Sequence, residues 1–453
     1  MYCESDFQRR LEHPDAESSP HDEYSRDYAR LVHSAAVRRL ARLGCDGLAD
    51  ESGEAPTVLS RALEAAEIAR RIVKRLNQDV PFLRRGGGGI DPNLVALGCI
   101  GRECGRPPFG KLGESILDRC MRQHGGFMSS AQCLRQLAVI EIYASDDPQL
   151  QCIDAQGKDR RLGLDLSYRS YAALTRFSGK IPFRRDDRSE RSGSHYASED
   201  RLVGKIRAHV APGVPDHETL QTIECGIAEL AEFIATTVLE FESAMRTGLA
   251  HPLCFVATFD GDDGLCEMLV EDLYRRTGRR TNGHQVRAAI GREFEQLIDP
   301  AANASVSSNV RAYRVSRELS GNPCRRAQYI DGLTKRLIDA VLMRVEDEAP
   351  ALSSVRLSDD AQLLAEAMRA YCKEVAPAPR RMALQGIDAG KVLETLLDAI
   401  DGDYGDELLP PGLACGLARI ADTDARKRYI CDFLAGLTEP GAVALLNRLS
   451  ILR

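Results

Sequence analysis

Three short stretches place basic and acidic side chains at spacings that suit the handling of a charged substrate. Arg61 lies in an amphipathic segment, Arg102 directly precedes Glu103, and Lys111 lies three residues before Glu114. A guanidinium group offers five N–H donors and no acceptor, and it keeps its proton at physiological pH. Arginine therefore binds phosphate well but cannot coordinate a metal ion through nitrogen, as a neutral histidine does. The glutamates can hold a cation or pair with these basic groups.

The elements that must position these side chains are predicted to be helices. In 57–78, apolar residues recur at helical spacing and basic residues lie largely opposite. Asp91 and Pro92 predict an N-cap and first turn for a helix over 92–104. A polar stretch at 180–200 indicates a long loop near the mouth of the site, and a helical run follows at 219–249. Strand signals are weak, so the expected fold class is all-α.

Composition divides the chain into three parts. Residues 1–24 are polar and rich in Pro, Ser, Asp and His, which indicates a loosely ordered arm. Residues 25–250 are expected to form a helical core. Residues 251–453 alternate helical segments with Pro and Gly breaks, and they predict a C-terminal helical region packed on the core.

Charge and cysteine usage exclude several classes of protein. The formal net charge of −7 argues against a surface coated with positive charge for non-specific DNA binding. The 14 cysteines are scattered without a Cys-x-x-Cys pair, which favours reduced thiols in the cytoplasm over a zinc site. The N-terminus lacks the apolar core of a signal peptide, and we expect no membrane association. The run Gly86–Gly89 is no P-loop, because no Gly-Lys-Ser/Thr follows it.

Three stretches in fixed order carry a family resemblance: DYAR at 27–30 with HSAAVRRL at 33–40, GRPPFGKLGE at 105–114, and LDLSYR at 164–169 with AAL at 172–174. Looser matches are FMSSAQ at 127–132 and RYICDFLAGLT at 428–438. Together they resemble the bacterial deoxyguanosine triphosphate triphosphohydrolases (dGTPases) of the HD-domain superfamily, over nearly the whole chain from about residue 25. The resemblance implies an HD-type helical core of the dNTP triphosphohydrolase type with additional C-terminal helices.

The resemblance also implies a chemistry. Active members hold a divalent metal with a histidine on one helix, an adjacent His-Asp pair on the next, and a later aspartate. Attack at the α-phosphorus of a dNTP then gives a deoxynucleoside and tripolyphosphate. Active members form homo-oligomers and respond to nucleotides or single-stranded DNA away from the metal, so these are the partners that the resemblance implies.

At the four metal-ligand positions of that family, this sequence has other residues. Arg61 stands where the first histidine belongs, and Arg102 and Glu103 replace the His-Asp pair. On the later helix the best match, 233–238, puts Thr236 at the ligand position, and a shift of one residue places no aspartate there either. One carboxylate does not hold a transition metal usefully, because such sites need three or four ligands. We therefore expect no metal and no other cofactor.

The remaining family positions are mixed. Lys111 stands at the catalytic histidine, whereas its partner Glu114 is retained. The Lys-Tyr pair that contacts nucleotide appears as Arg176-Phe177, and the sugar-contacting tyrosine appears as Glu240. Arg38 is a further candidate for phosphate contact.

Two explanations of the introduced cations stay open. Arg61, Arg102 and Lys111 can stand in for the metal and hold the phosphates of a nucleotide. Alternatively, ion pairs such as Arg61–Glu103 or Arg102–Glu114 fill and close the pocket.

The leading functional hypothesis is a catalytically degenerate dGTPase-like protein that binds nucleotide or partner subunits, as a homo-oligomer or with an active paralogue, and acts in regulation or assembly. The alternative is an active dNTP triphosphohydrolase with Mg²⁺ or Mn²⁺ on a rebuilt carboxylate cluster of Glu64, Glu103, Glu114 and Glu240. A third hypothesis is a structural subunit without a ligand.

Overall fold

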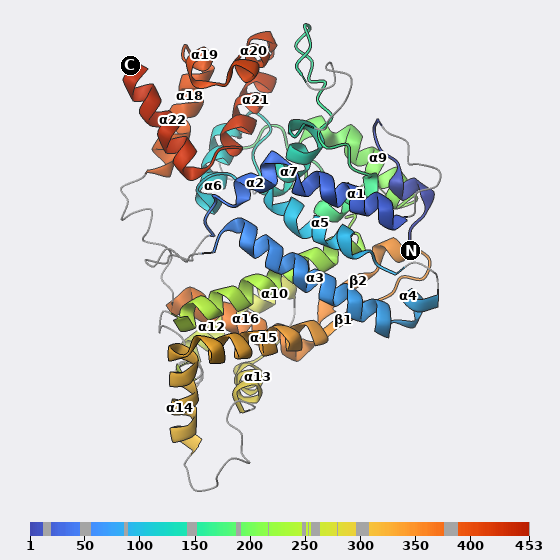
Figure 1. The fold of residues 1–453 in the computed structure, drawn as a ribbon, viewed down its shortest axis with the longest axis vertical. Helices are drawn as coiled ribbons and strands as arrows, with labels where there is room; N and C mark the ends of the chain where they lie inside the picture. The colour runs from blue at the N-terminus through green and yellow to red at the C-terminus, as the bar shows by residue number, and fades with distance from the viewer. Residues whose placement is uncertain are drawn as a thin grey trace. The chain divides into compact units, whose positions relative to one another are not determined.

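The chain forms helices over most of its length and divides into two compact units (Figure 1). The structure, a computed structural model, describes residues 1–11, 20–45, 56–85, 89–142, 152–186, 192–215, 217–246, 251, 253–254, 263–278, 280–295, 308–375 and 388–452. Within these ranges the only sheet has two strands, β1 (Val341–Arg344) and β2 (Ser354–Leu357). The predicted all-α fold class is confirmed. Unit 1 comprises Met1–Ala231, Arg344–Ser354 and Arg381–Arg453, and unit 2 comprises Glu232–Met343 and Val355–Arg380.

The first half of unit 1 contains the helices that carry the candidate site. In chain order they are η1 (Glu4–Phe7), α1 (Pro20–Val32), α2 (Ala35–Leu40), α3 (Val58–Asp79), α4 (Pro81–Arg85), α5 (Pro92–Glu103), α6 (Gly110–Met121), α7 (Ser129–Arg135), η2 (Gln136–Ile140), α8 (Tyr168–Leu174), η4 (Ala197–Glu199), α9 (Asp200–Val210) and the start of α10 (Ile223–Arg246). The Thr57 side chain caps α3 by accepting from the Ser60 N–H. Asp91 caps α5, with Pro92 in its first turn, as its sequence predicts. Helix α3 packs lengthwise against α5, which brings the predicted site residues of both helices to one interface.

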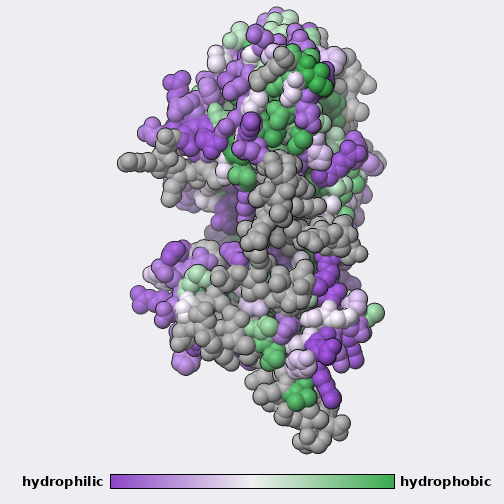
Figure 2. Space-filling model, turned by 90° about the vertical axis from the view of Figure 1, so that its left-hand side faces the viewer, coloured by the Kyte–Doolittle hydropathy of each residue, from purple (hydrophilic) through white to green (hydrophobic). Residues whose placement is uncertain are grey.

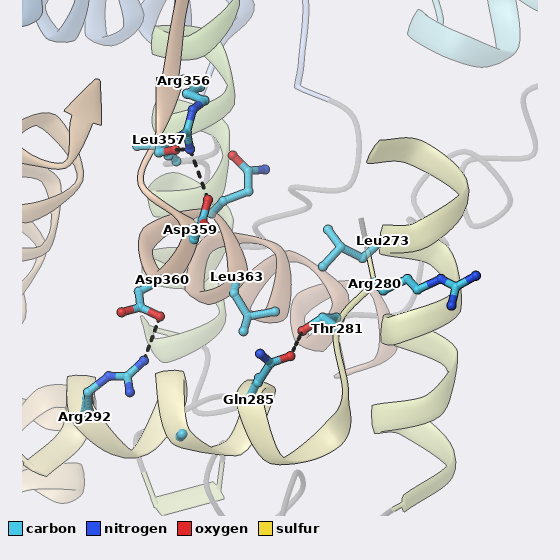
Figure 3. Close-up of a pocket in the computed structure, with 12 residues that line it drawn as sticks. Leu273, Arg280, Thr281, Gln285, Arg292, Arg356, Leu357, Asp359, Asp360 and Leu363 are labelled. Atoms are coloured by element: carbon cyan, nitrogen blue, oxygen red, sulfur yellow. Dashed lines mark hydrogen bonds and ion pairs between the residues drawn. The ribbon is translucent and has the colours of Figure 1, made fainter. Parts of the chain in front are cut away.

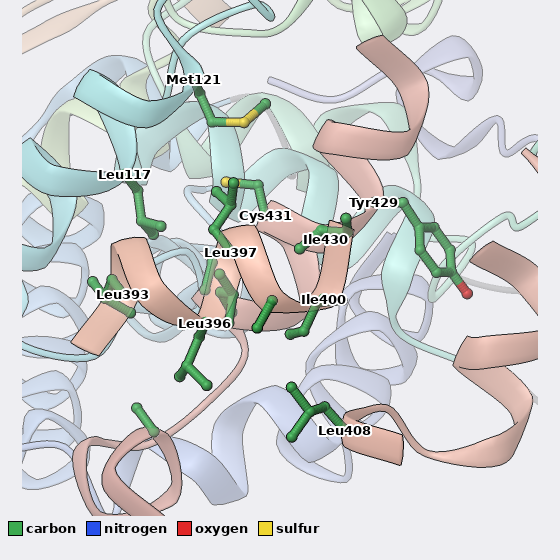
Figure 4. Packing of buried hydrophobic residues seen from close by; sticks show 14 of the residues in the cluster. Leu117, Met121, Leu393, Leu396, Leu397, Ile400, Leu408, Tyr429, Ile430 and Cys431 are labelled. Atoms are coloured by element: carbon green, nitrogen blue, oxygen red, sulfur yellow. The ribbon is translucent and has the colours of Figure 1, made fainter. Parts of the chain in front are cut away.

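The C-terminal helices of unit 1 are α18 (Ala389–Asp401), α19 (Gly405–Leu408), α20 (Pro411–Arg419), α21 (Thr423–Ala435) and α22 (Glu439–Leu452). Figure 4 shows the core that they share with α6, where Leu117 and Met121 face Leu393 and Leu397 of α18 and Cys431 of α21. The two compact units divide the chain within α10, between Ala231 and Glu232, and the domain boundary at residue 250 stays a prediction. The apolar face of α18 has to be buried, and it packs against α6, which is far away in the sequence.

Unit 2 contains the rest of α10 with α12 (Asp263–Thr277), α13 (Gly283–Glu295), α14 (Ser308–Gly321), α15 (Pro323–Asp339) and α16 (Asp359–Val375). The Asn322 side chain caps α15 by accepting from the N–H groups of Cys324 and Arg325. Helix α13 packs on α16, and α14 on α15.

Figure 2 shows one face of the molecule, where most of the coloured surface is hydrophilic and the hydrophobic areas are small.

The N-terminal segment is held more firmly than its polar composition indicates. Phe7 is buried, and Arg9 is buried in ion pairs with Glu23, at 2.6 Å, and Asp27. The Tyr2 hydroxyl donates to Glu224 of α10 at 2.9 Å. Residues 1–11 thus differ from the loosely ordered arm predicted over 1–24, because two aromatic anchors and one buried arginine are present among the polar residues. Residues 12–19, like parts of the predicted 86–89 connection and 180–200 loop, lie outside the described ranges.

Within the ranges given above, no single helix has the length and apolarity needed to cross a bilayer. Helices α21 and α22 meet that criterion only when they are joined, and they are bent by 118° relative to each other.

The fully buried Arg169 of α8 provides a test of how unit 1 is held together. Its guanidinium contacts Glu224 at 3.0 Å and Asp6 at 3.4 Å. Burial opposes the charge of Arg169, but the two carboxylates keep its pKa above the ordinary arginine value. We predict that Glu224→Gln lowers the free energy of unfolding by about 3 kcal/mol, because it leaves a buried charge poorly compensated. Urea unfolding of the variant measures this loss. The exposed Glu218→Gln is the control, and equal stabilities for the two variants would contradict the prediction.

Candidate functional site

The centre of the candidate site is a buried ion pair between α3 and α5. Arg61 is 8% exposed and Glu103 is 6% exposed, and the Arg61 Nη2 lies 2.6 Å from the Glu103 Oε1. The other carboxylate oxygen, Oε2, faces Nη1 of Arg106 at 3.5 Å. Both oxygens of Glu103 are therefore engaged by guanidinium groups. Of the two explanations left open by the sequence, this arrangement matches the ion pair. Arg61 and Glu103 contact each other at positions where the family resemblance implies metal ligands.

A second cluster joins two predicted phosphate-binding residues through a carboxylate that the sequence did not reveal. Glu229 of α10 accepts from Arg102 at 3.3 Å and from Arg176 at 2.9 Å. The amide of Gln221 also donates to Glu229, at 2.7 Å. Arg102 is thereby linked to α10, and its Nη1 also donates to the Leu174 carbonyl at 3.3 Å. No local signal in the sequence identifies Glu229, because its partners Arg102 and Arg176 come from two other elements.

The turn before α6 places Lys111 and Glu114 in different surroundings. Phe109 and Gly110 have φ angles of 65° and 53°, so the chain enters α6 through a left-handed turn. Lys111 is exposed, whereas Glu114 points to the start of α7. There its carboxylate accepts from the Ser129 hydroxyl at 2.6 Å and from the Ser129 N–H at 3.3 Å. Glu114 therefore supports the N-terminus of α7, which has no side-chain cap of its own.

The other predicted residues have separate locations. Thr236 and Glu240 lie on the part of α10 that belongs to unit 2. Arg38 is exposed on α2 and donates to the His33 carbonyl at 2.6 Å. Glu64 is exposed on α3. Among the residues selected from the sequence, Arg61 contacts Glu103 directly, and Arg102 and Arg176 both contact Glu229.

The residues at the resemblance's metal positions do not fit a metal ion. Arg61 and Arg102 present only donors and a fixed positive charge, and the carboxylate of Glu103 is already shared by two guanidinium groups. Across the ranges that the structure describes, no three His, Cys, Asp or Glu side chains gather in a way that can hold a metal ion. No metal-dependent step follows from this arrangement.

Comparison with known proteins places these features in a family. A family model described as a phosphohydrolase-associated domain matches residues 355–448. The chain is 29% identical to the deoxyguanosinetriphosphate triphosphohydrolase-like protein 2 of Mesorhizobium japonicum, over 99% of this chain and 98% of that protein. It is 26% identical to the deoxyguanosinetriphosphate triphosphohydrolase-like protein of Rhodopseudomonas palustris strain HaA2, over 99% and 95%. It is 28% identical to the protein so named in Streptomyces coelicolor, over 94% and 92%. The chain is similar over nearly its whole length to dGTPase-like proteins.

In this dGTPase-like protein, packing explains why one family motif persists beside the altered positions. A Cβ at Gly105 would lie 2.1 Å from the Ser129 carbonyl oxygen, and a Cβ at Gly113 would lie 1.9 Å from the Pro108 carbonyl oxygen. Only glycine permits these two close approaches, because any side chain would collide with backbone. Gly105 and Gly113 are therefore needed for the fold of the dGTPase-like scaffold whether or not the chain performs the family's chemistry.

Unit 2 of the dGTPase-like chain has a pocket of its own, of about 660 Å³ (Figure 3). Two of its arginines are paired, Arg292 with Asp360 at 2.9 Å and Arg356 with Asp359 at 3.0 Å. The buried Leu273, Leu357 and Leu363 contribute apolar lining. Most of its lining charge is thus compensated within the pocket, and sequence reasoning did not single out any of these residues.

The Arg61–Glu103 pair predicts a specific pattern of stabilities. Glu103→Met leaves the buried Arg61 without this carboxylate, and we expect a loss of about 3–5 kcal/mol in the free energy of unfolding. The double variant Arg61→Met/Glu103→Met removes both charges and should recover about half of that loss or more. A double-mutant cycle from urea unfolding measures the coupling. Additive effects of the two substitutions would show that the pair does not act as a unit.

Proposed function

We propose that this chain is a non-hydrolysing dGTPase-like protein that acts by binding nucleotide or partner subunits, in regulation or assembly. The observation that carries the proposal is the buried Arg61–Glu103 pair, because it occupies two of the positions at which the resemblance requires metal ligands. A guanidinium cannot be converted into a ligand by any change of pH in the physiological range.

The acid–base positions support the same proposal. Lys111 is an exposed ammonium group, and such a group is a poor proton shuttle near neutral pH. The carboxylate of Glu114 is held by the Ser129 hydroxyl and N–H, which gives it a structural role at the start of α7. Neither residue is arranged with the other as an acid–base pair in the described contacts.

Nucleotide binding is supported by the second cluster. Arg102 and Arg176 both contact the carboxylate of Glu229. Half of the Arg176 side chain is exposed, and its guanidinium is accessible to a ligand from solvent. Arginine binds a phosphate group through paired hydrogen bonds, so an exposed Arg176 suits this ligand. Homo-oligomer formation, pairing with an active paralogue, single-stranded DNA binding and a cytoplasmic location are parts of the proposal that the family resemblance motivates.

The first prediction concerns catalysis. We expect no release of tripolyphosphate from any of the dNTPs above the buffer rate, with Mg²⁺ or Mn²⁺ present, because Arg61 and Arg102 cannot coordinate the metal at the family's ligand positions. Product analysis by anion-exchange chromatography measures this, and circular dichroism shows that the protein is folded. Release that is abolished by a chelator and by Glu114→Ala would instead identify a rebuilt carboxylate site on residues such as Glu64, Glu103 and Glu114.

The second prediction concerns metal binding. Combining Arg61→His, Arg102→His, Glu103→Asp and Thr236→Asp should create Mn²⁺ binding that the parent chain lacks, because these changes supply the family's four ligands. Isothermal titration calorimetry with MnCl₂ measures it. Glu218→Gln, at an exposed position, is the control variant. A folded fourfold variant that binds no Mn²⁺ would show that Thr236 is not the position of the fourth ligand.

A further inference from the structure

The pocket of unit 2 lies between α13 and α16, and both helices present a regular set of side chains to it (Figure 3). On α13, Gln285, Ala288 and Arg292 are three and four residues apart, so they lie on one side of the helix. Because Ala288 has only a methyl group, the space between the two longer side chains stays open. On α16, Asp360 and Leu363 are three residues apart and line the same pocket.

One wall of the pocket is apolar. Leu273 of α12, Leu357 of β2 and Leu363 of α16 contribute to it, and all three are buried except for the surface that faces the pocket opening. In Figure 3, Leu363 lies between Asp359 and Gln285. The volume of about 660 Å³ is in the range that holds small organic molecules. The pocket can therefore hold an apolar group of a ligand beside its charged residues.

The charged wall places opposite charges next to each other. Nη2 of Arg292 lies 2.9 Å from Oδ1 of Asp360, and this contact joins α13 to α16. The side chain of Arg292 is 54% exposed and that of Asp360 is 76% exposed, so a ligand from solvent can reach both groups. Ion pairs at such exposure contribute little to stability. A ligand can therefore replace this contact without disturbing the fold.

The remaining charges of the pocket do not favour one sign strongly. Arg356 contacts Asp359, three residues further along the chain, at 3.0 Å, and it also donates to the Leu357 carbonyl at 3.2 Å. Arg280 is exposed and forms no ion pair with any residue that the structure describes. The lining thus contains three guanidinium groups and two carboxylates. A ligand with several negative charges would meet both carboxylates, which disfavours it.

The pair of Arg292 with Asp360 restricts the ligand further. An anion that binds Arg292 separates it from Asp360 and brings a second negative charge next to this carboxylate. A cation that binds Asp360 leaves Arg292 without its partner. A zwitterion satisfies both groups at once, because its carboxylate accepts from the guanidinium through paired hydrogen bonds and its ammonium donates to Asp360. The ion pair therefore selects a ligand that carries both charges close together.

We propose that this pocket binds a free α-amino acid with an apolar side chain. Arg292 binds the α-carboxylate, and Asp360 binds the α-ammonium group. The side chain of the amino acid packs against Leu273, Leu357 and Leu363. This site goes beyond the proposed function, because none of its residues is one of the altered metal or acid–base positions.

The test titrates the full chain with L-leucine by isothermal titration calorimetry, with saturation-transfer NMR as a second readout. Leucine should bind with a Kd of about 1 mM or tighter. Two analogues keep its carbon skeleton and lose one charge each: 4-methylpentanoate has no ammonium group, and 3-methylbutylamine has no carboxylate. Each should bind at least about tenfold more weakly than leucine. Glycine, which has no side chain, should also bind at least about tenfold more weakly.

The Arg292→Ala variant tests the carboxylate contact and should weaken leucine binding by about tenfold or more. It should bind 3-methylbutylamine at least as tightly as the parent chain does, because Asp360 no longer has an internal partner. The matched control is Arg325→Ala, at an exposed arginine of α15 outside the pocket, which should leave both affinities unchanged.

The Ala288→Trp variant tests the pocket itself, because the indole ring fills it from an exposed position on α13. Leucine should then bind at least about tenfold more weakly. Its control is Ala327→Trp, at an exposed alanine of α15 outside the pocket, which should leave leucine binding unchanged. Circular dichroism shows that each variant is folded. If Ala288→Trp does not fold, Arg292→Ala decides, since it changes only an exposed side chain.

Three results would overturn the proposal. One is a Kd for leucine weaker than about 1 mM. Another is binding of 4-methylpentanoate or 3-methylbutylamine as tight as that of leucine. The third is unchanged leucine binding by folded Arg292→Ala or Ala288→Trp. Tripolyphosphate release and Mn²⁺ binding are measured separately and involve other residues, so this proposal and the proposed function can fail independently.

Discussion

A buried arginine needs a carboxylate to compensate its charge, and such ion pairs join the helices of unit 1. The Arg61–Glu103 pair joins α3 to α5, the helix pair on which the candidate site is built. The same requirement recurs at Arg9, at Arg135 and at the fully buried Arg169, each of which contacts two or more acidic side chains. Breaking such a pair strands a buried charge, whereas removing both partners together does not. The paired arginines therefore stabilise the fold. An arginine that binds a ligand has to be one that does not take part in such a buried pair.

Steric and electrostatic constraints explain why this chain has the family's residues at some positions and other residues at the metal-ligand positions. Gly105 and Gly113 are fixed by carbonyl oxygens that would lie about 2 Å from any Cβ, so their retention follows from folding alone. Metal-ligand positions have no such constraint, because an Arg–Glu pair of similar size can fill the space between α3 and α5. A motif that persists for packing reasons is not evidence of activity. Whether the chain can hydrolyse a dNTP depends instead on whether the side chains at the ligand positions can coordinate a metal ion.

Local signals in the sequence predicted the helices well and the long-range contacts poorly. The α3 and α5 segments were evident from their apolar spacing and from Asp91 with Pro92, because capping depends on neighbouring residues. The Arg61–Glu103 pair was one of two open explanations, since both residues were already assigned to adjacent family positions. Tyr2 could not be assigned to Glu224, 222 residues away, because nothing in a polar N-terminal segment specifies its distant partner. Glu229 was missed for the same reason, as its role depends on Arg102 and Arg176 from two other elements.

Under our proposal that the chain does not hydrolyse dNTPs, charge compensation indicates which arginines can still bind a ligand. At Glu229, Arg102 and Arg176 contact the same carboxylate, and half of the Arg176 side chain is exposed, so Arg176 can meet an anion from solvent. Near Arg428, Arg135 pairs with Glu199 and Asp432, and Arg161 pairs with Asp159. Asp422 and Asp424 line the same pocket as Arg428. Nη1 of Arg428 is buried without a hydrogen-bond partner, and its guanidinium lies over the Tyr196 ring. Binding of an anion at Arg176 depends on no metal ion. Nucleotide binding without hydrolysis, as we propose it, is therefore compatible with the arginines at the family's metal positions.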